Sequence, residues 1–284
     1  MNRKTVGRIG IYAFLLSSAA FFLIPVYIMV TTSLKGMPEI REGNIFALPL
    51  DPNFSAWVKA WSSACIGMAC DGIRGGFSNS LTIMIPSVIL SVALSAINGY
   101  ALALWNIRRA ELLMGLLMAG AFVPYQVLLY PLVIMTRTVG IYGKLPGIIA
   151  IHVLFGLPVL TLIFRNFYAS LPTEIMKAAR VDGASFLQIF WRIMLPMSPS
   201  ILVVAVILQV TGIWNDYLLG LIFAGRDNLP MTAQLNNLVN STFGEKEYNV
   251  NMAATILTAA TPLLVYLISG RYFVRGITSG AVKG

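Results

Sequence analysis

Charged side chains are scarce in this chain: Asp, Glu, Lys and Arg make up 11% of its residues, against roughly a quarter in an ordinary soluble domain. Cysteine is limited to Cys65 and Cys70, and His152 is the single histidine, so no metal cluster or catalytic thiol array is expected. Apolar residues instead reach 57% and recur from end to end without a long polar block. The composition therefore predicts an all-α polytopic membrane protein with one transmembrane domain over residues 1–284.

Other absences exclude classes of function. The chain has no G-x-x-x-x-G-K-[ST] phosphate loop, so it is not expected to hydrolyse ATP itself. Its apolar segments hold no carboxylate pair or Ser and His set placed for catalysis, so we expect no enzyme. The formal charge of +9 does not indicate nucleic-acid binding, because the lysines and arginines are scattered and form no single stripe.

Long apolar runs are plentiful. A bilayer core of about 30 Å needs roughly 20 apolar helical residues. The first run is longer than the core of a signal peptide and is therefore expected to be an uncleaved span. Prolines inside the runs are expected to kink the helices rather than end them. The sequence predicts six transmembrane helices, at 9–31, 81–104, 112–135, 145–164, 199–223 and 250–270.

Basic residues predict the orientation of these spans. The shorter, more basic set of loops is expected in the cytoplasm, with both termini, because positive charge is retained inside. Cys65 and Cys70 then share the first external loop, where a disulfide and two free thiols both remain open, since spacing does not fix the geometry. The residues that indicate the cytoplasmic side are Arg3, Lys4, Arg8, Arg108, Arg109, Arg165, Lys177, Arg180, Arg192, Arg271, Arg275 and Lys283.

The loop between the fourth and fifth spans, residues 171–196, predicts two short helices. Thr173 is suited to cap a first helix from Glu174 to Asp182, and Gly183 stands where a left-handed residue would end it. Ser185 and Gln188 have capping-box spacing for a second helix, from Phe186 to Leu195. Such a helical hairpin could bind a partner protein or lie on lipid headgroups, and physics alone leaves both open.

The same loop resembles the EAA loop of ABC importer permeases, which contains Glu-Ala-Ala, a glycine four residues on and a later Ile-x-Leu-Pro. Lys177 departs from the pattern, because the family most often has Glu there. The matching residues are Ala178, Ala179, Asp182, Gly183, Ala184, Ile193, Leu195 and Pro196. The residues that this resemblance implies in ATPase coupling are Glu174, Lys177, Ala178, Ala179, Arg180, Asp182, Gly183 and Ala184.

Segments 123–131, 212–223 and 276–284 extend the resemblance to the sugar-permease branch, which includes the smaller maltose permease subunit. The cysteine-containing loop is similar to that of glucose and mannose members. The resemblance implies the type I importer permease fold in a bacterial cytoplasmic (inner) membrane. It further implies a heterodimer with a second permease, two ATPase subunits and an extracytoplasmic sugar-binding protein. ATP and Mg would bind to the ATPase partner, so this chain is expected to bind no cofactor or metal, and its last residues would reach that partner or fray.

Few polar residues interrupt the spans. Gln209, Asn215, Asp216 and Tyr217 are candidates to line a translocation path, and each could instead join helices. Asp216 is the only acid placed within a span, and a solvated or hydrogen-bonded structural role competes with a functional one. His152 is expected to pack between helices. An ion-gradient-driven secondary transporter is the alternative function, disfavoured because the sequence shows neither a clear repeat nor a second intramembrane acid.

Overall fold

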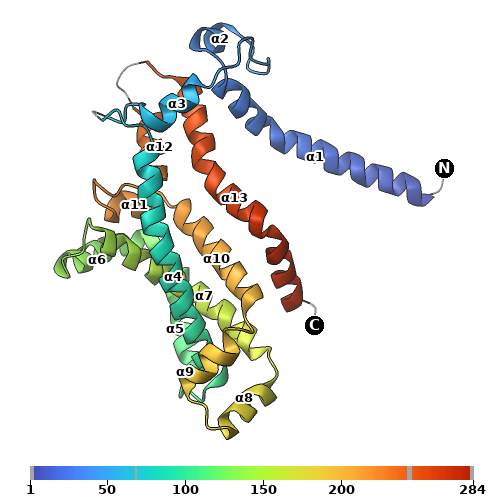
Figure 1. Ribbon diagram of the computed structural model, residues 1–284, viewed down its shortest axis with the longest axis vertical. Coiled ribbons are helices and arrows are strands. Elements are labelled where there is room, and N and C mark those ends of the chain that lie inside the picture. The colour runs from blue at the N-terminus through green and yellow to red at the C-terminus, as the bar shows by residue number, and fades with distance from the viewer. Residues whose placement is uncertain (1–2, 68, 242–244, 282–284) are drawn as a thin grey trace. The chain divides into compact units, whose positions relative to one another are not determined.

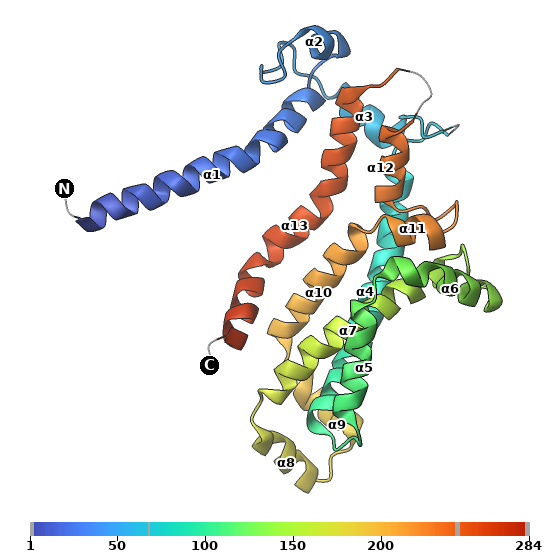
Figure 2. The same cartoon turned by 180° about the vertical axis from the view of Figure 1, so that it is seen from behind.

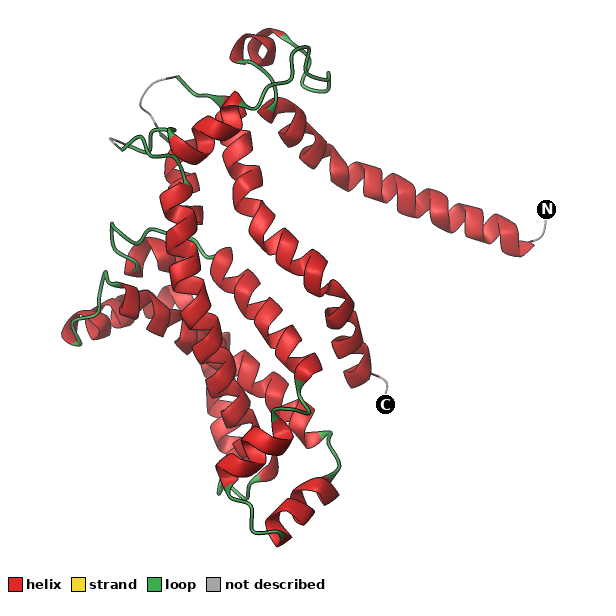
Figure 3. Cartoon of the chain, in the orientation of Figure 1, coloured by secondary structure: helices red, strands yellow, loops and turns green. Residues whose placement is uncertain are grey.

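The structure is a computed structural model that describes residues 3–67, 69–241 and 245–281. Within these ranges the chain is built almost entirely of helices (Figure 3). A helix satisfies its own backbone hydrogen bonds, which lipid cannot do, so long apolar runs become helices. The internal contacts divide the chain into two compact units: unit 1 is Met1–Gly75 with Gln234–Ala260, and unit 2 is Gly76–Ala233 with Thr261–Gly284. The single domain expected over 1–284 stays a prediction.

Unit 1 contains the N-terminal span and short helices on the loop that follows it. None of the residues in the apolar window of its first helix is buried, so that helix presents its side chains to lipid or to another subunit. The helices of unit 1 are α1 (Arg3–Ser33), α2 (Met37–Glu42), α3 (Ser55–Ser62), the end of α12 (Met231–Val239) and the first part of α13 (Tyr248–Ala281).

Unit 2 is organised around α7 (Leu145–Ala169), which contacts α5, α10 and α11. It also approaches α4 closely: a Cβ atom at Gly99 would lie 2.6 Å from the Cβ atom of Phe164. The remaining elements of unit 2 are α4 (Arg74–Leu104), α5 (Ala110–Phe122), α6 (Tyr125–Thr138), α8 (Thr173–Val181), α9 (Phe186–Ile189), the π-helix η1 (Phe190–Met194), α10 (Pro199–Trp214) and α11 (Leu218–Phe223). Figure 1 labels these helices.

Four helices in the described ranges are long and apolar enough to cross a membrane without a break. Two further helix pairs pass the same test but are bent, by 101° between α5 and α6 and by 92° between η1 and α10. Counting each bent pair as one span gives the expected number of six, but the second pair covers Phe186–Trp214 and not the expected run 199–223. The unbroken segments are Gly7–Ser33, Arg74–Leu104, Leu145–Ala169 and Tyr248–Gly270.

Two of the expected spans are not continuous helices. The run 112–135 breaks at Val123 (ψ 124°), because the ring of Pro124 disfavours helical backbone in the residue before it. The run 199–223 is interrupted after Trp214, and a second short helix begins at Leu218. Pro86, Pro158 and Pro262, by contrast, lie inside continuous helices, as expected.

Candidate functional site

The segment 171–196 forms the two helices expected from its sequence, here called the knob (Thr173–Met194). Figures 1 and 2 show α8 and α9 together at the end of unit 2 where α4 and α7 finish. The first helix begins one residue earlier than predicted, so Thr173 is its first residue and not its cap. Pro172 precedes it with φ −59°, a value already suited to entering a helix. Gly183 adopts φ 78°, which confirms the left-handed turn.

The second half of the knob carries the predicted capping box. The backbone N–H of Ser185 donates to Oε1 of Gln188 over 2.8 Å, and the N–H of Gln188 donates to the Ser185 hydroxyl oxygen over 3.5 Å. Only Phe186–Ile189 is α-helical, however, and the expected continuation to Leu195 is a π-helix. Its wider turn is shown by the Leu195 N–H, which donates to the carbonyl of Phe190 five residues earlier over 2.9 Å.

A cluster of aromatic rings joins the knob to the ends of α4 and α7. The fully buried ring of Tyr100 lies 4.8 Å from Phe186, 5.6 Å from Phe190 and 6.1 Å from Tyr168, measured between ring centroids. Ser198, just after the knob, donates to the Tyr168 hydroxyl over 3.2 Å. Offset and edge-to-face aromatic contacts add to the stability from burial, so the knob is held as one piece with two spans. The sequence analysis did not predict this aromatic cluster. The i, i+4 spacing of Phe186 and Phe190 was a signal for it, because it places both rings on one side of a helix.

Arg180 makes its contacts inside unit 2. Its Nη2 donates to the carbonyl of Leu104 over 2.9 Å, and its guanidinium lies 4.5 Å from the centre of the Trp105 ring. The carbonyl of Leu104 belongs to the last turn of α4, which has no intrahelical donor. Arg180 thus caps α4 and ties α8 to it.

The outer surface of the knob combines exposed polar and apolar side chains. Val181 is 87% exposed, and Leu187 and Trp191 are 55% and 57% exposed. Met176 and Ala179 face inward and are buried. The predicted coupling residues at the surface of the described chain are Glu174, Lys177, Ala178, Arg180, Asp182 and Gly183, while Ala184 is half-buried. The knob therefore leaves three large apolar side chains accessible among its charged residues.

The candidate path residues meet at a second site in unit 2. A cavity of about 380 Å³ is lined by Gln209, Asn215 and Asp216, three of the four predicted residues, and Tyr217 is not among its lining residues. Sequence reasoning had not placed the other lining residues there. These are Tyr125, His152, Phe155, Gly156, Gly212, Ile213 and Leu219.

Asp216 lies in the break between α10 and α11, not inside a helix. Its carboxylate accepts hydrogen bonds from the backbone N–H groups of Leu219 (3.2 Å) and Gly220 (2.8 Å), so it caps α11. His152 also lies beside this carboxylate: its Nε2 is 3.9 Å from Oδ2, the oxygen that accepts from Gly220. His152 is buried, and its carbonyl accepts a hydrogen bond from Gln209 over 3.4 Å. His152 therefore packs between helices, as expected.

Trp214, the last residue of α10, is a core residue. Its ring is 1% exposed and packs edge-on against Phe77, with 5.7 Å between the ring centroids. The end of α10 turns this ring toward α4 and away from lipid.

Both the sequence and the fold of the chain are similar to those of known membrane proteins. The chain belongs to the family of binding-protein-dependent transport system inner membrane components, whose family model matches residues 91–279. It is therefore a multi-pass permease component of an ABC transporter, and no finding favours the ion-gradient alternative.

Individual proteins support the same assignment. A probable ABC transporter permease protein of Pyrococcus horikoshii is 34% identical and covers 100% of both chains. The alpha-glucoside transport system permease protein AglG of Rhizobium meliloti is 38% identical over 76% of this chain and 58% of its own length. The fold is similar to a chain in the crystal structure of a bacterial ABC transporter involved in alginate import, with a TM-score of 0.81, 20% identity and coverage of 96% and 99% of the two chains.

Proposed function

We propose that this chain is the permease subunit of a sugar importer, and that a separate ATPase docks on the knob to drive it. The alpha-glucoside permease relative supports a sugar as cargo. The observation that carries the proposal is the knob, a helical hairpin on which Val181 is exposed. The ring of Tyr100 packs against the base of this hairpin and connects it to two spans. The resemblance of the first external loop favours glucose or mannose among the sugars. A second permease and an extracytoplasmic sugar-binding protein complete the proposed assembly.

The proposed mechanism uses the knob as a lever. When two ATPase subunits close on ATP and Mg, they move α8, and the aromatic cluster around Tyr100 passes the movement to α4 and α7. The membrane helices then rock as rigid bodies, so that the path opens alternately to the two sides of the membrane. The knob must bind the open and closed states of the ATPase pair with different affinities. A contact of equal strength in both states would not shift the equilibrium between them. Gly183 and the capping box keep the lever stiff by fixing the turn between its helices.

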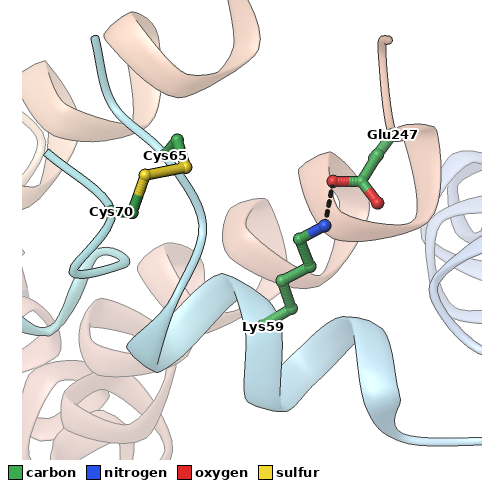
Figure 4. Close-up of a disulfide and its surroundings, with 4 residues drawn as sticks. All are labelled: Lys59, Cys65, Cys70 and Glu247. Atoms are coloured by element: carbon green, nitrogen blue, oxygen red, sulfur yellow. Dashed lines mark ion pairs between the residues drawn. A yellow bond between two sulfur atoms is a disulfide. The ribbon is translucent and has the colours of Figure 1, made fainter. Parts of the chain in front are cut away.

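The orientation of the chain is supported by the disulfide between Cys65 and Cys70, drawn in Figure 4 beside the ion pair of Lys59 and Glu247. Disulfides persist in oxidising compartments outside the cytoplasm. The bond closes just before α4 begins, and the 31-residue α4 is long and apolar enough to cross the membrane once. At its far end the carbonyl of Leu104 accepts a hydrogen bond from Arg180 of the knob, and the proposal places this end in the cytoplasm, where ATP is available.

Two exposed valines allow a matched test of ATPase docking. Val181 lies on the knob, whereas Val139 is 67% exposed at the end of α6, away from it. We expect Val181→Arg to abolish co-purification of the ATPase and sugar-stimulated ATP hydrolysis in the reconstituted complex, because a charge enters an apolar contact. Val139→Arg should leave both unchanged. Normal ATPase recovery with Val181→Arg, or equal losses with both variants, would overturn the docking assignment.

A further inference from the structure

Two interruptions of membrane helices meet at the cavity of unit 2. Tyr125 follows the break between α5 and α6, and Asn215 and Asp216 form the break between α10 and α11. Irregular backbone at membrane depth is tolerated where it is buried in protein or lines a water-filled cavity. In secondary transporters, discontinuous helices hold the cargo because freed backbone groups point into the gap, and the same chemistry is available at these breaks. Because both helix breaks lie at the same cavity, this cavity is a candidate binding site.

Each of the two helices beside the cavity presents one face to it. His152, Phe155 and Gly156 on α7 have i, i+3, i+4 spacing, which places them on a single side of the helix. Gln209, Gly212 and Ile213 on α10 follow the same pattern. A Cβ atom at Gly156 would overlap the amide of Gln209, so glycine is required for that amide to lie there. At Gly212 a Cβ atom would meet nothing within 4 Å, so this glycine leaves space open.

The chemistry of the lining suits a hydroxylated ring. Tyr125 and Phe155 form an aromatic pair with ring centroids 6.1 Å apart, which offers apolar faces to the C–H side of a sugar. Asn215 is exposed at the cavity with an amide that can both donate and accept hydrogen bonds. Among the residues that the structure describes, the lining holds no Lys or Arg that could pair with an anionic ligand, and its one acid, Asp216, already accepts two backbone hydrogen bonds. The volume of about 380 Å³ falls in the usual range of small-molecule sites.

We infer that this cavity is a subsite for one uncharged sugar ring on the translocation path, held by Asn215 and the rings of Tyr125 and Phe155. This inference rests on the proposed sugar-import function and adds that this subunit contacts the cargo itself. Gln209 and Asp216 act as positioning residues: Gln209 holds the α7 backbone at His152, and Asp216 fixes the break that presents Asn215.

The first test fills the cavity in the complete reconstituted importer. Gly212→Leu places a side chain into the open space, and Gly115→Leu is the matched control, since a Cβ atom at Gly115 on α5 also meets nothing within 4 Å. The probe is whichever of D-glucose, D-mannose, maltose or D-xylose stimulates ATP hydrolysis by the wild-type complex. We expect Gly212→Leu to lower its uptake at least about tenfold, the loss expected when one good polar contact is prevented. ATPase co-purification and thermal stability should match those of the control.

A second measurement keeps the inference falsifiable if Gly212→Leu assembles poorly. Both native cysteines are in the disulfide, so Gly212→Cys supplies the single free thiol of the chain. We measure the rate at which aminoethyl methanethiosulfonate labels this cysteine. We expect the rate to fall severalfold when the sugar that stimulates ATP hydrolysis is added, and to be unaffected by D-glucuronate. Labelling of Gly115→Cys should respond to neither.

The outcomes separate the two proposals. If none of the four sugars stimulates ATP hydrolysis, the proposed glucose or mannose cargo is refuted, and the subsite is refuted for these sugars. If a sugar stimulates hydrolysis while Gly212→Leu transports normally and Gly212→Cys is not protected, the importer stands and the subsite is refuted. Protection by D-glucuronate equal to that by the neutral sugar would refute the assignment of an uncharged ligand.

Discussion

Gly183 provides a sharp test of the lever, because a single added methyl group strains the turn of the knob without touching anything else. Its φ of 78° lies in the left-handed region, and a Cβ atom built there meets nothing within 4 Å. Within this chain, the effect of Gly183→Ala is therefore backbone strain alone. Since the turn connects α8 to the capped start of α9, strain there changes the angle between the two halves of the lever.

The magnitude follows from the cost of the left-handed conformation. For a residue with a Cβ atom this cost is roughly 1–2 kcal/mol, so the population of the native turn falls by a factor of about 5 to 30. Gly183→Asn should lose less, because asparagine enters this region more readily. Gly115→Ala is the matched control: Gly115 lies within α5, where alanine is favoured over glycine by roughly 0.5–1 kcal/mol.

The assay compares sugar uptake with ATP hydrolysis in proteoliposomes that contain the assembled importer. We expect Gly183→Ala to reduce uptake per ATP hydrolysed severalfold, Gly183→Asn to fall between it and the wild type, and Gly115→Ala to behave as the wild type. Membrane insertion, measured by the amount of subunit in the membrane, should be the same for all. Wild-type coupling in Gly183→Ala, or an equal loss in Gly115→Ala, would refute the view that this turn stiffens a lever.

Three further substitutions test the supports of the two sites. Gly99→Val should lower the melting temperature of the purified complex, because its Cβ atom would lie 2.6 Å from the Cβ of Phe164 and overpacking costs about 1–3 kcal/mol; an unchanged melting temperature would contradict the close approach of α4 and α7. Ser185→Ala removes half of the capping box and should destabilise the knob by about 1 kcal/mol, seen as faster proteolysis of the knob, whereas Ser185→Thr should restore protection. Asp216→Leu leaves two backbone donors of α11 without their acceptor, at about 1–3 kcal/mol. Thermal unfolding should show that loss, and Asp216→Asn should recover part of it; equal stability of both variants would argue against the capping role.

The sequence of the knob predicted its main features because they depend on local chemistry. Gly183 occurs where only a residue without a Cβ atom adopts the required backbone cheaply, and Ser185 and Gln188 satisfy each other within one turn. The anchor at Tyr100 could not be predicted in the same way. Its partners Phe186 and Phe190 lie far along the chain, and a buried aromatic residue has the same composition as a lipid-facing one.

The path residues show the same limit. Polar residues in apolar runs marked Gln209, Asn215 and Asp216, and the structure brings these three to one cavity. The role of each residue depends on its neighbours from other helices. Gln209, for example, donates a hydrogen bond to the backbone of His152, which lies 57 residues earlier in the sequence. Tyr125 and Phe155 could not be assigned to the cavity, since hydropathy does not report which side of a span faces another helix.

By itself, the sequence determined the all-helical membrane architecture, the approximate positions of its apolar runs and the turn of the knob, because hydrophobic length and local backbone preference act over a few consecutive residues. Only the tertiary structure decided that the run with Pro124 breaks there while helices continue through Pro86, Pro158 and Pro262, and that the run 199–223 breaks after Trp214. It also decided that Trp214 is a core residue and that Asp216 caps α11. The physical reason is that lipid and protein interior are equally apolar, so hydrophobicity places a residue in the membrane but packing between helices decides what it contacts.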